Sequence, residues 1–516
     1  MNPMPERDPV LVIGAGLVGP VLAAALARRG HPVQVVDRRL DPRVTSEESS
    51  RSVNLVISRR GWSVLETLGM EERVRAIGRP LRGRTVHPSA FQQTQFQPYS
   101  RSGEHIWCVE RPALNALLLD MLDELPGVAL RFGQRCRDID LEHRRVAFSR
   151  MDEPELRWES TTRVLAADGA FSGARQSLLY GRFNYSQSYM AMGYKQFLLP
   201  AQGDGGPALA LDTFHVWPRD TALVGAFPNA DGSFTGSLFM LHEGEHGFEG
   251  LERPGAALRF VAEMLPDLRP WQETICTQLE ANPVTPLVTI RARPWVQDDF
   301  LALVGDAAHA ILPFFGQGMN CGFEDAHCLV RCLDETEDDW GEALRRYEAE
   351  RRPNADAIAD MSLEHFRELS GSGEPDPDPD FRLLVESALY EHHSDRFAPL
   401  YERVAFSEMN FVDARSSERE RRRIVSRILS IPGIRQCWAD MGPVLLNQAV
   451  ESGPDNLDRI PLLIAMLEEA MADGVITPDE EALLERVAKV LNLQPEDVER
   501  ARELVCSPVV GRSNTR

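Results

Sequence analysis

The chain has 516 residues, 43% of them hydrophobic and 26% charged, which is typical of a globular protein and excludes a disordered or fibrous one. Lys and Arg number 56 against 78 Asp and Glu, and the resulting net charge of −22 argues against nucleic acid or an anionic membrane as the main partner. The eight cysteines form no C-x-x-C pair, which argues against a disulfide framework or a zinc site and favours a reducing, cytoplasmic compartment.

The first predicted element is a buried parallel strand at Val10–Ile13, followed at once by the glycine-rich stretch GAGLVG and an Ala/Leu-rich helix. A second strand at 32–36 ends in an acid. This order predicts a dinucleotide site, in which the glycines permit a tight turn and a close approach to a pyrophosphate, and the acid accepts from a ribose hydroxyl. The pattern alone does not choose between FAD and NAD(P). The residues assigned to the nucleotide are Gly14, Gly16, Leu17, Val18, Gly19, Asp37 and Arg38.

Residues 10–27 are uncharged and long enough to suggest a membrane span, but they contain three glycines and a proline, and acidic residues precede them. We therefore expect no membrane anchor there, nor after residue 430, where no long apolar run follows.

Two further predicted strands end in acidic turns. The strand at 161–167 leads into Asp168-Gly169, and the strand at 300–304 leads into Gly305-Asp306. A Pro-Phe-Phe-Gly-Gln-Gly loop and a helix at 321–333 follow, and N–H groups at the helix start favour negative charge on a reduced flavin.

These segments, in this order, resemble the class A flavoprotein aromatic hydroxylases, and within them the kynurenine 3-monooxygenases. The resemblance rests on GDAAHAILPFFGQGMNCGFED at 305–325, RSVNL at 51–55, FNYSQ at 183–187 and HVWPR at 215–219, and it covers about residues 10–406. It implies a Rossmann-type FAD-binding domain with an interleaved antiparallel β-sheet substrate domain, followed by an α-helical C-terminal region.

The resemblance also implies the reaction: bound FAD, with NADPH as a transient co-substrate, and dioxygen hydroxylate the aromatic ring of L-kynurenine to 3-hydroxykynurenine through a flavin hydroperoxide. The residues alone do not choose NADPH over NADH. We expect no metal and no catalytic side chain, because the cofactor carries the chemistry. The further FAD contacts implied are Asn54, Arg111, Asp168, Gly305, Asp306, Gly318, Met319 and Asn320.

The family binds the substrate carboxylate with an Arg and a Tyr, which correspond to Arg84 and Tyr99. His365 stands where the family has an Asn; it can still donate a hydrogen bond, but the change puts the identity of the substrate in doubt. The other pocket residues implied are Glu368, Tyr401, Phe314, Phe315 and Gln317. We interpret His309 as a hydrogen-bonded structural histidine.

The predicted domains are an FAD-binding domain in two parts (1–180, with a substrate-domain strand segment near 80–110, and 291–370), a β-sheet domain (181–290), a helical region closing the active site (371–455) and a helical module (456–516). In this last module, helices are expected at 460–471, from Pro478 to 491 and from 495 to 505, with a capping box at Thr477–Glu480. It resembles the TerB-like domain, which implies a protein partner.

Three alternatives stay open. The first is a hydroxylase of another aromatic amino acid or tryptophan-derived metabolite, which His365 favours. The second is a flavoprotein reductase of the same fold, and the third is a flavin-binding scaffold that acts through the C-terminal module. The sequence does not give the oligomeric state.

Overall fold

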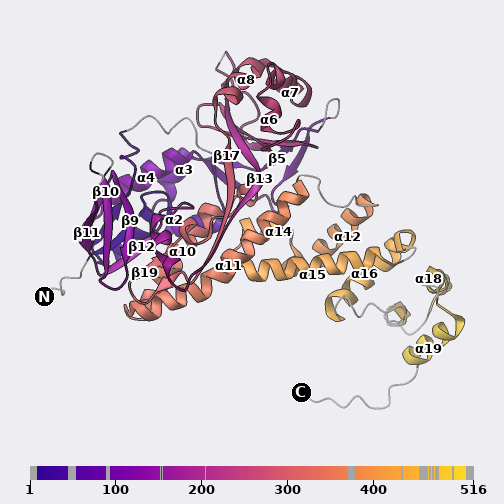
Figure 1. Ribbon diagram of the computed structural model, residues 1–516. Helices are drawn as coiled ribbons and strands as arrows, with labels where there is room; N and C mark the ends of the chain where they lie inside the picture. Colours follow the sequence, from indigo (N-terminus) through magenta and orange to yellow (C-terminus); the bar gives the residue numbers. More distant parts are fainter. Residues whose placement is uncertain are drawn as a thin grey trace. The chain divides into compact units, whose positions relative to one another are not determined.

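A computed structural model describes residues 9–44, 54–88, 93–150, 153, 155–203, 205–369, 378–431, 434–452, 476–490 and 493–506, with 463, 466, 467 and 470. The chain forms two compact units (Figure 1), one of residues 1–373 with 404–412 and the other of 374–403 with 413–516. The first unit contains all the sheets described below.

A six-stranded sheet forms the first layer of this unit, in the order β18-β19-β12-β1-β2-β8. β1, β2, β8, β12 and β19 run parallel, and the apolar residues of all but the edge strand β8 are buried because helices cover the sheet. The strands predicted at 10–13, 32–36, 161–167 and 300–304 are confirmed. The elements are β1 (Val10–Ile13), β2 (Val33–Val36), β8 (Val128–Arg131), β12 (Arg163–Ala166), β18 (Val296–Gln297) and β19 (Leu301–Leu303).

Four long helices belong to this layer, and α1 packs against both α4 and α10. α1 ends at Arg28, two residues before Gly30 turns the chain with a φ of 80°. The bounds are α1 (Val18–Arg28), α4 (Arg111–Asp123), α10 (Gly318–Glu335) and α11 (Trp340–Leu369).

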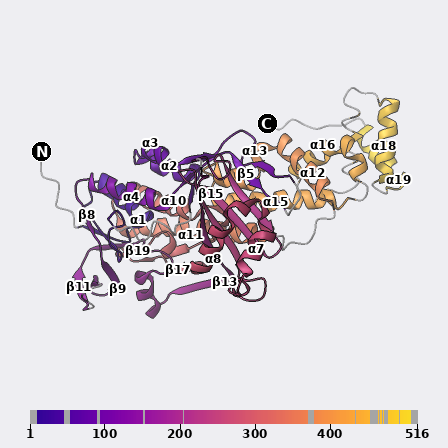
Figure 2. The same cartoon turned by 90° about the horizontal axis from the view of Figure 1, so that it is seen from above.

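A seven-stranded sheet, in the order β17-β13-β16-β15-β14-β5-β6, forms the second part of the unit. One of its faces is apolar and packs on short helices, which gather over it in Figures 1 and 2. The strands are β5 (Gly83–Val86), β6 (Gln95–Pro98), β13 (Asn184–Leu199), β14 (Thr213–Arg219), β15 (Ala222–Pro228), β16 (Phe234–Leu241) and β17 (Thr285–Arg293). The helices are α6 (Phe248–Leu251), α7 (Ala256–Met264), η2 (Pro266–Trp271) and α8 (Gln272–Ala281).

Two three-stranded sheets and several short helices complete the first unit. One sheet is β11-β10-β9 and the other is β3-β7-β4. Their bounds are β3 (Leu55–Ile57), β4 (Arg79–Leu81), β7 (Ile106–Val109), β9 (Gln134–Asp140), β10 (Arg145–Arg150) and β11 (Arg157–Ser160). The helices are α2 (Arg59–Thr67), α3 (Glu71–Ile77), α5 (Gly173–Gln176), η1 (Ser177–Tyr180), α9 (Asp306–His309) and η3 (Pro313–Phe315).

The second unit is helical and has its own hydrophobic core. The predicted capping box is confirmed: Thr477 N–H donates to Glu480 at 2.7 Å, and Glu480 N–H donates to Thr477 Oγ1 at 3.3 Å. The helices are α12 (Pro379–His392), α13 (Ser394–Phe397), α14 (Leu400–Ala405), α15 (Phe411–Leu429), α16 (Ile434–Ser452), α18 (Pro478–Val490) and α19 (Pro495–Cys506), of which α14 and α15 begin or end in the first unit.

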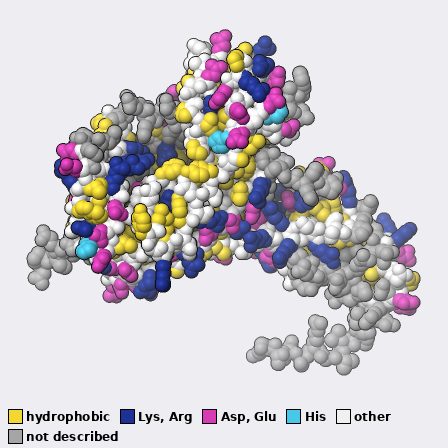
Figure 3. Space-filling view, viewed as in Figure 1, with side chains coloured by type: hydrophobic (Ala, Val, Ile, Leu, Met, Phe, Trp, Pro, Cys, Tyr) yellow, Lys and Arg dark blue, Asp and Glu magenta, His cyan; other side chains and the backbone are white. Residues whose placement is uncertain are grey.

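Much of the helix predicted at 460–471 lies outside the described residues, as do residues 51–53 of the RSVNL segment. Within the described parts of the chain, no helix combines the length and the apolar character needed to cross a membrane. Acidic and basic side chains are interspersed over the face seen in Figure 3, so the net negative charge is not gathered into one patch there.

Candidate functional site

The predicted nucleotide motifs meet at one edge of the parallel sheet. Ile13 pairs with Ala166 and with Val36, and Ala166 pairs with Leu303, so the four strands end side by side. The glycine loop, Asp37, Asp168 and the 305–306 turn therefore lie along the carboxyl edge, where open α/β sheets bind their ligands.

The three glycines of the loop are required for different reasons. Gly14 has a φ of 108°, and a Cβ on Gly19 would lie 1.8 Å from the Gly14 carbonyl oxygen. The backbone itself therefore requires glycine at both positions, whether or not a ligand is bound. A Cβ on Gly16 would meet no protein atom within 4 Å. The open space beside Gly16 is where the start of α1 would receive a phosphate.

Asp37 ends β2 and is held by its surroundings. Its Oδ2 accepts from the Ala15 N–H at 2.7 Å, and its Oδ1 accepts from Arg39 Nε at 3.1 Å. Burial alone would raise the pKa of Asp37, but the bonds and charge of Arg39 and the Ala15 N–H hold it below its ordinary value. Arg38, the predicted nucleotide contact, is exposed, and the neighbouring Arg39 bonds to Asp37.

Asp168 closes the turn after β12. Its Oδ2 accepts from the N–H groups of Gly173 at 2.8 Å and Ala174 at 3.2 Å, whereas its Oδ1 is buried and has no hydrogen-bond partner in the described structure. Burial raises the pKa of this carboxyl. Arg175, one turn on, donates to the carbonyl of Ala307 at 2.7 Å and so ties this turn to the 305–306 turn.

A buried ionic network stabilises the turn after β19. The Asp325 carboxylate accepts from the Gly305 N–H at 3.0 Å and from Arg351 Nε at 2.7 Å, and it lies 2.5 Å from His309 Nε2. Burial alone would raise the pKa of Asp325, but the charges of His309 and Arg351 hold it at about 2. Asp306 remains exposed at the start of α9. The interpretation of His309 as a hydrogen-bonded structural residue is confirmed.

Val18 lies where three of these segments meet. A Cβ on Gly305 would come within 3.2 Å of the Val18 side chain, and one on Gly322 within 2.5 Å. The two glycines therefore allow the 305–306 turn and α10 to approach the start of α1, and Leu17 is buried beside them.

α10 begins at Gly318, so the N–H groups of Gly318, Met319 and Asn320 have no acceptor within the helix and form its positive end. The buried side chains around this end bond to the protein. Asn320 donates to the Val56 carbonyl at 2.8 Å, and Gln317 accepts from the Ser58 hydroxyl at 3.2 Å. Asn54 donates to Asn229 Oδ1 at 2.8 Å.

Arg84 and Tyr99 are placed together by the pairing of β5 with β6. Arg84 pairs with Gln97, and its Nε donates to Gln97 Oε1 at 2.7 Å, while the Tyr99 N–H donates to the Arg82 carbonyl at 3.1 Å. Opposite residues and residues two apart share a face of a sheet, so Arg84 and Tyr99 lie on one face. Both side chains are half-buried.

This same face carries aromatic rings along the rest of the sheet. Phe214 pairs with Arg84 and stacks on Phe227 at 4.0 Å, and Tyr194 on β13 lies 5.5 Å from Phe239 on β16. The opposite face packs on α7 and α8. The face that carries Arg84 is therefore the one left for a ligand, and we call it the open face.

Aromatic contacts connect the open face to η3 and to α11. Phe239 lies 5.3 Å from Phe314, and Phe314 lies 4.4 Å from Phe366 on α11. His365 lies 5.0 Å from Phe315. The structure thus brings Phe314, Phe315 and His365 together.

The remaining predicted residues are placed as follows. Arg111 begins α4 with an exposed side chain whose charge acts on Asp306 and Tyr194. Tyr401 belongs to the second unit and is half-buried there. Glu368 lies on α11, and its side chain is outside the described residues.

The FAD binding domain family matches residues 7–362. A kynurenine 3-monooxygenase of Christiangramia forsetii is 38% identical over 436 residues, which are 84% of this chain and 96% of the relative. One of Salinispora tropica is 38% identical over 81% of this chain and 93% of its own. The chain belongs to the kynurenine 3-monooxygenase family.

Solved structures support the fold of this family member. The tetrameric form of 2-methyl-3-hydroxypyridine-5-carboxylic acid oxygenase has a TM-score of 0.58 at 20% identity, covering 71% of this chain and 93% of that one. The P. aeruginosa PqsL structure in complex with 2-aminobenzoylacetate has a TM-score of 0.57 at 22% identity, covering 71% and 99%. The family described as tellurite resistance protein TerB matches residues 446–503, so the C-terminal resemblance is confirmed.

The site fits the FAD that this family of flavoprotein monooxygenases binds. The open space at Gly16, the unpartnered Oδ1 of Asp168 and the exposed carboxylate of Asp306 line the carboxyl edge of the sheet beside the positive end of α10. The open space suits a pyrophosphate, the two carboxylates suit ribityl hydroxyls, and the positive end of α10 suits a reduced ring.

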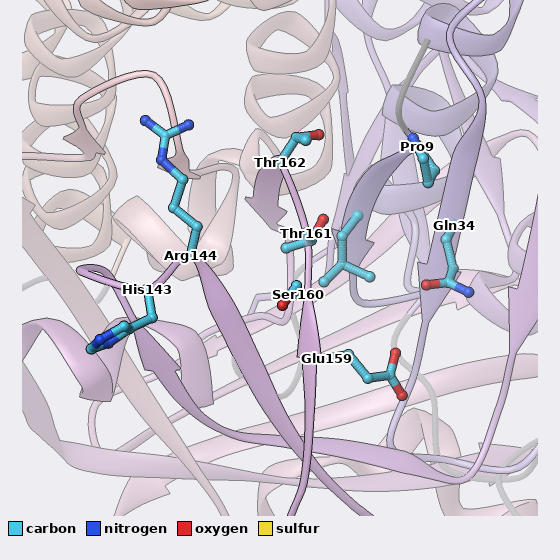
Figure 4. Close-up of a pocket in the computed structure, with 9 residues that line it drawn as sticks. Pro9, Gln34, His143, Arg144, Glu159, Ser160, Thr161 and Thr162 are labelled. Carbon is cyan, nitrogen blue, oxygen red and sulfur yellow. The ribbon is translucent and has the colours of Figure 1, made fainter. Parts of the chain in front are cut away.

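A cavity of about 310 Å³ lies elsewhere in the first unit (Figure 4). Leu11, Gln34, Thr161 and Thr162 line it from the amino-terminal ends of the parallel strands, and His143 and Arg144 from the β9–β10 turn. Because ligands of such sheets bind at the carboxyl ends, this cavity is not the nucleotide site.

Sequence reasoning missed Arg39, Gln97, Arg175, Asp325 and Tyr194 as residues that shape the site. Asp325 stands inside the matched 305–325 segment, so its carboxylate in an apolar helix was a usable signal. The partner of Arg175 lies 132 residues away, and no local pattern indicates it.

Proposed function

We propose that the protein is a kynurenine 3-monooxygenase that hydroxylates L-kynurenine to 3-hydroxykynurenine with FAD, dioxygen and NADPH. The observation that carries the proposal is the pairing that sets the half-buried Arg84 beside Tyr99 on the open face, opposite the Phe314–Phe315 turn. A cation and a hydroxyl suit a carboxylate, and the aromatic rings suit the apolar ring of the same substrate.

Each group of residues has a distinct task in this proposal. Arg84 and Tyr99 bind the substrate carboxylate, and Gln97 holds the Arg84 guanidinium through its 2.7 Å bond. The rings of Tyr194, Phe239, Phe314 and Phe366 orient the substrate and exclude water. The N–H groups at the start of α10 favour negative charge beside them. When bound, FAD supplies the redox chemistry that activates dioxygen.

The test is to purify the yellow holoenzyme and to follow NADPH oxidation with and without L-kynurenine, identifying the product by mass. We expect L-kynurenine to stimulate NADPH oxidation and the product to gain one oxygen atom. A parallel series with NADH decides the coenzyme. No stimulation, or reduction of the substrate without oxygen consumption, contradicts the proposal.

A second candidate is hydroxylation of another aromatic amino acid or tryptophan-derived metabolite. It is favoured by His365, which stands where the family has an Asn and lies beside Phe315. Stimulation by L-kynurenine without a hydroxylated product, together with hydroxylation of such an analogue, would select it.

Three further features belong to the proposal. We place the enzyme in the cytoplasm, because the six cysteines whose side chains the structure describes are free thiols buried in the fold. The TerB-like segment is assigned a protein partner. We also propose that the functional domains are divided at residues 180, 290, 370 and 455, as the sequence predicts.

A further inference from the structure

A chain of hydrogen bonds crosses the buried side of the substrate sheet, directly behind Arg84. His87 follows β5, and its Nε2 lies 2.9 Å from Nδ1 of His215 on β14. His87 Nδ1 lies 2.6 Å from Asp267 Oδ2 on η2, and His215 Nε2 lies 2.9 Å from the Ala210 carbonyl. Both rings are buried, at 8% and 3% exposure. We call these three side chains the histidine clamp.

Counting protons shows that the histidine clamp holds one positive charge. A carbonyl only accepts, so His215 Nε2 carries a hydrogen, and the ionised Asp267 requires one on His87 Nδ1. The bond between the rings needs one more, because two bare nitrogens would set their lone pairs against each other. Three hydrogens on two rings make one imidazolium.

The surroundings disfavour this charge on the His215 ring. Burial, together with repulsion from His87, lowers the pKa of His215 to about 4, so His215 stays neutral. His87 faces Asp267, whose pKa is held below its ordinary value by bonds from His87 and Trp217 despite its burial. The other charges near the pair are Asp212, which acts on His215, and Arg219, which acts on Asp267.

The histidine clamp joins the strand that carries Arg84 to the rest of the domain. The His87 N–H donates to the Val216 carbonyl at 2.8 Å, and Arg219 donates to the His87 carbonyl at 2.9 Å. The His87 ring also stacks on Trp217 at 4.2 Å. β6 bonds only to β5 in this sheet, so the position of the β5–β6 pair depends on how β5 is held against β14.

We propose that His87, with His215 and Asp267, is a positioning residue: the proton shared by the two rings holds β5 against β14 and η2 and thereby keeps Arg84 and Tyr99 in place for the substrate carboxylate. The proposal rests on the function proposed above for Arg84 and Tyr99. His87 lies three residues from Arg84, on the opposite face of the strand, and acts through the strand alone.

The test compares the holoenzyme variants His87→Gln and Asp267→Asn with His143→Gln, a control that removes an exposed histidine paired with Asp140 on the β9–β10 turn. For both clamp variants we expect the KM for L-kynurenine to rise about tenfold, with kcat within twofold and bound FAD unchanged. The double variant should be no worse than either single one, because the two residues act as a unit. Equal KM values in His87→Gln and the control would overturn the proposal.

The split between KM and kcat separates positioning from a merely structural role. In His87→Gln the KM for L-kynurenine should rise while kcat and the unfolding temperature stay near the wild-type values. A parallel loss of kcat, FAD and thermal stability in His87→Gln would mean that the clamp is only structural.

Hydrogen exchange keeps this inference distinct from the proposed function. In His87→Gln, amides of residues 83–88 and 93–99 should exchange at least tenfold faster than in the wild type, and those of β9–β10 should not change. If Arg84→Met leaves the KM unchanged, the proposed substrate role fails, yet faster exchange would still show the clamp. If Arg84→Met raises the KM but exchange in His87→Gln is unchanged, the clamp alone fails.

Discussion

At the scale of single residues, the clearest prediction concerns Arg84. Arg84→Met should raise the KM for L-kynurenine by about 10²-fold, because removing a charged hydrogen-bond partner of a carboxylate costs about 2–3 kcal/mol. Arg82→Met is the matched control, since Arg82 lies on the same hairpin, is exposed and pairs with Asp212. Steady-state kinetics measure both variants. An equal effect of the two substitutions would mean that the hairpin, rather than Arg84, is responsible.

Asp325 gives a second residue-scale prediction, this time on stability. Asp325→Asn leaves the buried Arg351 with one carboxylate, that of Glu324 at 3.2 Å, and the Cys321 carbonyl, so the free energy of unfolding should fall by about 3 kcal/mol, the lower end for a broken buried ion pair. Urea unfolding of the apoprotein measures it. The surface pair of Asp299 with Arg144 is the control, and Asp299→Asn should cost less than 1 kcal/mol or so, roughly the value of an exposed pair.

The same carboxylate predicts a pH dependence. Its pKa is about 2 in the fold and 3.8 as the reference value, so its contribution of about 2 kcal/mol is present above pH 4 or so and is lost as the pH falls towards 2. The free energy of unfolding of the wild type should therefore fall between pH 6 and pH 2. In Asp325→Asn the fall over the same range should be about 2 kcal/mol smaller. Parallel curves would contradict this assignment.

What the sequence predicted at this scale depended on distance along the chain. The glycines, Asp37, Asp168 and Asp306 were found because each stands at the end of an apolar strand. The bond from Arg39 to Asp37 was missed because no periodicity marks which of two adjacent arginines turns back to the acid, and the nucleotide contact of Arg38 stays a prediction. His87 and His215 are 128 residues apart, and only sheet pairing brings them together.

At the scale of elements, two glycines in the turn between β1 and α1 allow the stability of the fold and the binding of FAD to be tested separately. Gly19→Ala would place a Cβ 1.8 Å from the Gly14 carbonyl, so it should destabilise the apoprotein itself. Gly16→Ala meets no protein atom within 4 Å and should leave apoprotein stability nearly unchanged while reducing FAD retention at least tenfold. Thermal unfolding of the apoprotein and the flavin absorbance after gel filtration give the two readouts. Normal flavin content in Gly16→Ala would show that this loop does not contact FAD.

The elements themselves were predictable where their signals are local. The strands of the parallel sheet are short apolar runs, and the Thr477 capping box is a four-residue pattern that the structure confirms. The order of the seven-stranded sheet was not predictable, because the paired residues of β5 and β14 are 130 positions apart and no residue on either strand specifies that partner. The shared face of Arg84 and Tyr99 follows from the pairing of β5 with β6.

At the scale of the whole molecule, the predicted boundary between 455 and 456 falls within residues that share one hydrophobic core. Leu463, Leu467, Leu484 and Val487 are buried in the same cluster as Leu445, on α16. The division into a helical region and a TerB-like module thus remains a prediction, which removal of residues 456–516 would test.

This truncation should expose the α16 side of the core, because it removes four buried aliphatic side chains, each worth about 1.5–3 kcal/mol, that pack in the same cluster as Leu445. We expect the second unit of the truncated chain to unfold at a lower temperature and to bind a hydrophobic dye, while the first unit retains FAD. The comparison is calorimetry and dye binding on full-length and truncated holoenzymes. Leu484→Ala in the full-length chain is the milder variant, expected to lower the same transition, whereas Leu383→Ala, at an exposed position on α12, is its control. A truncated chain that melts as the full-length one does would show that residues 456–516 are an independent module.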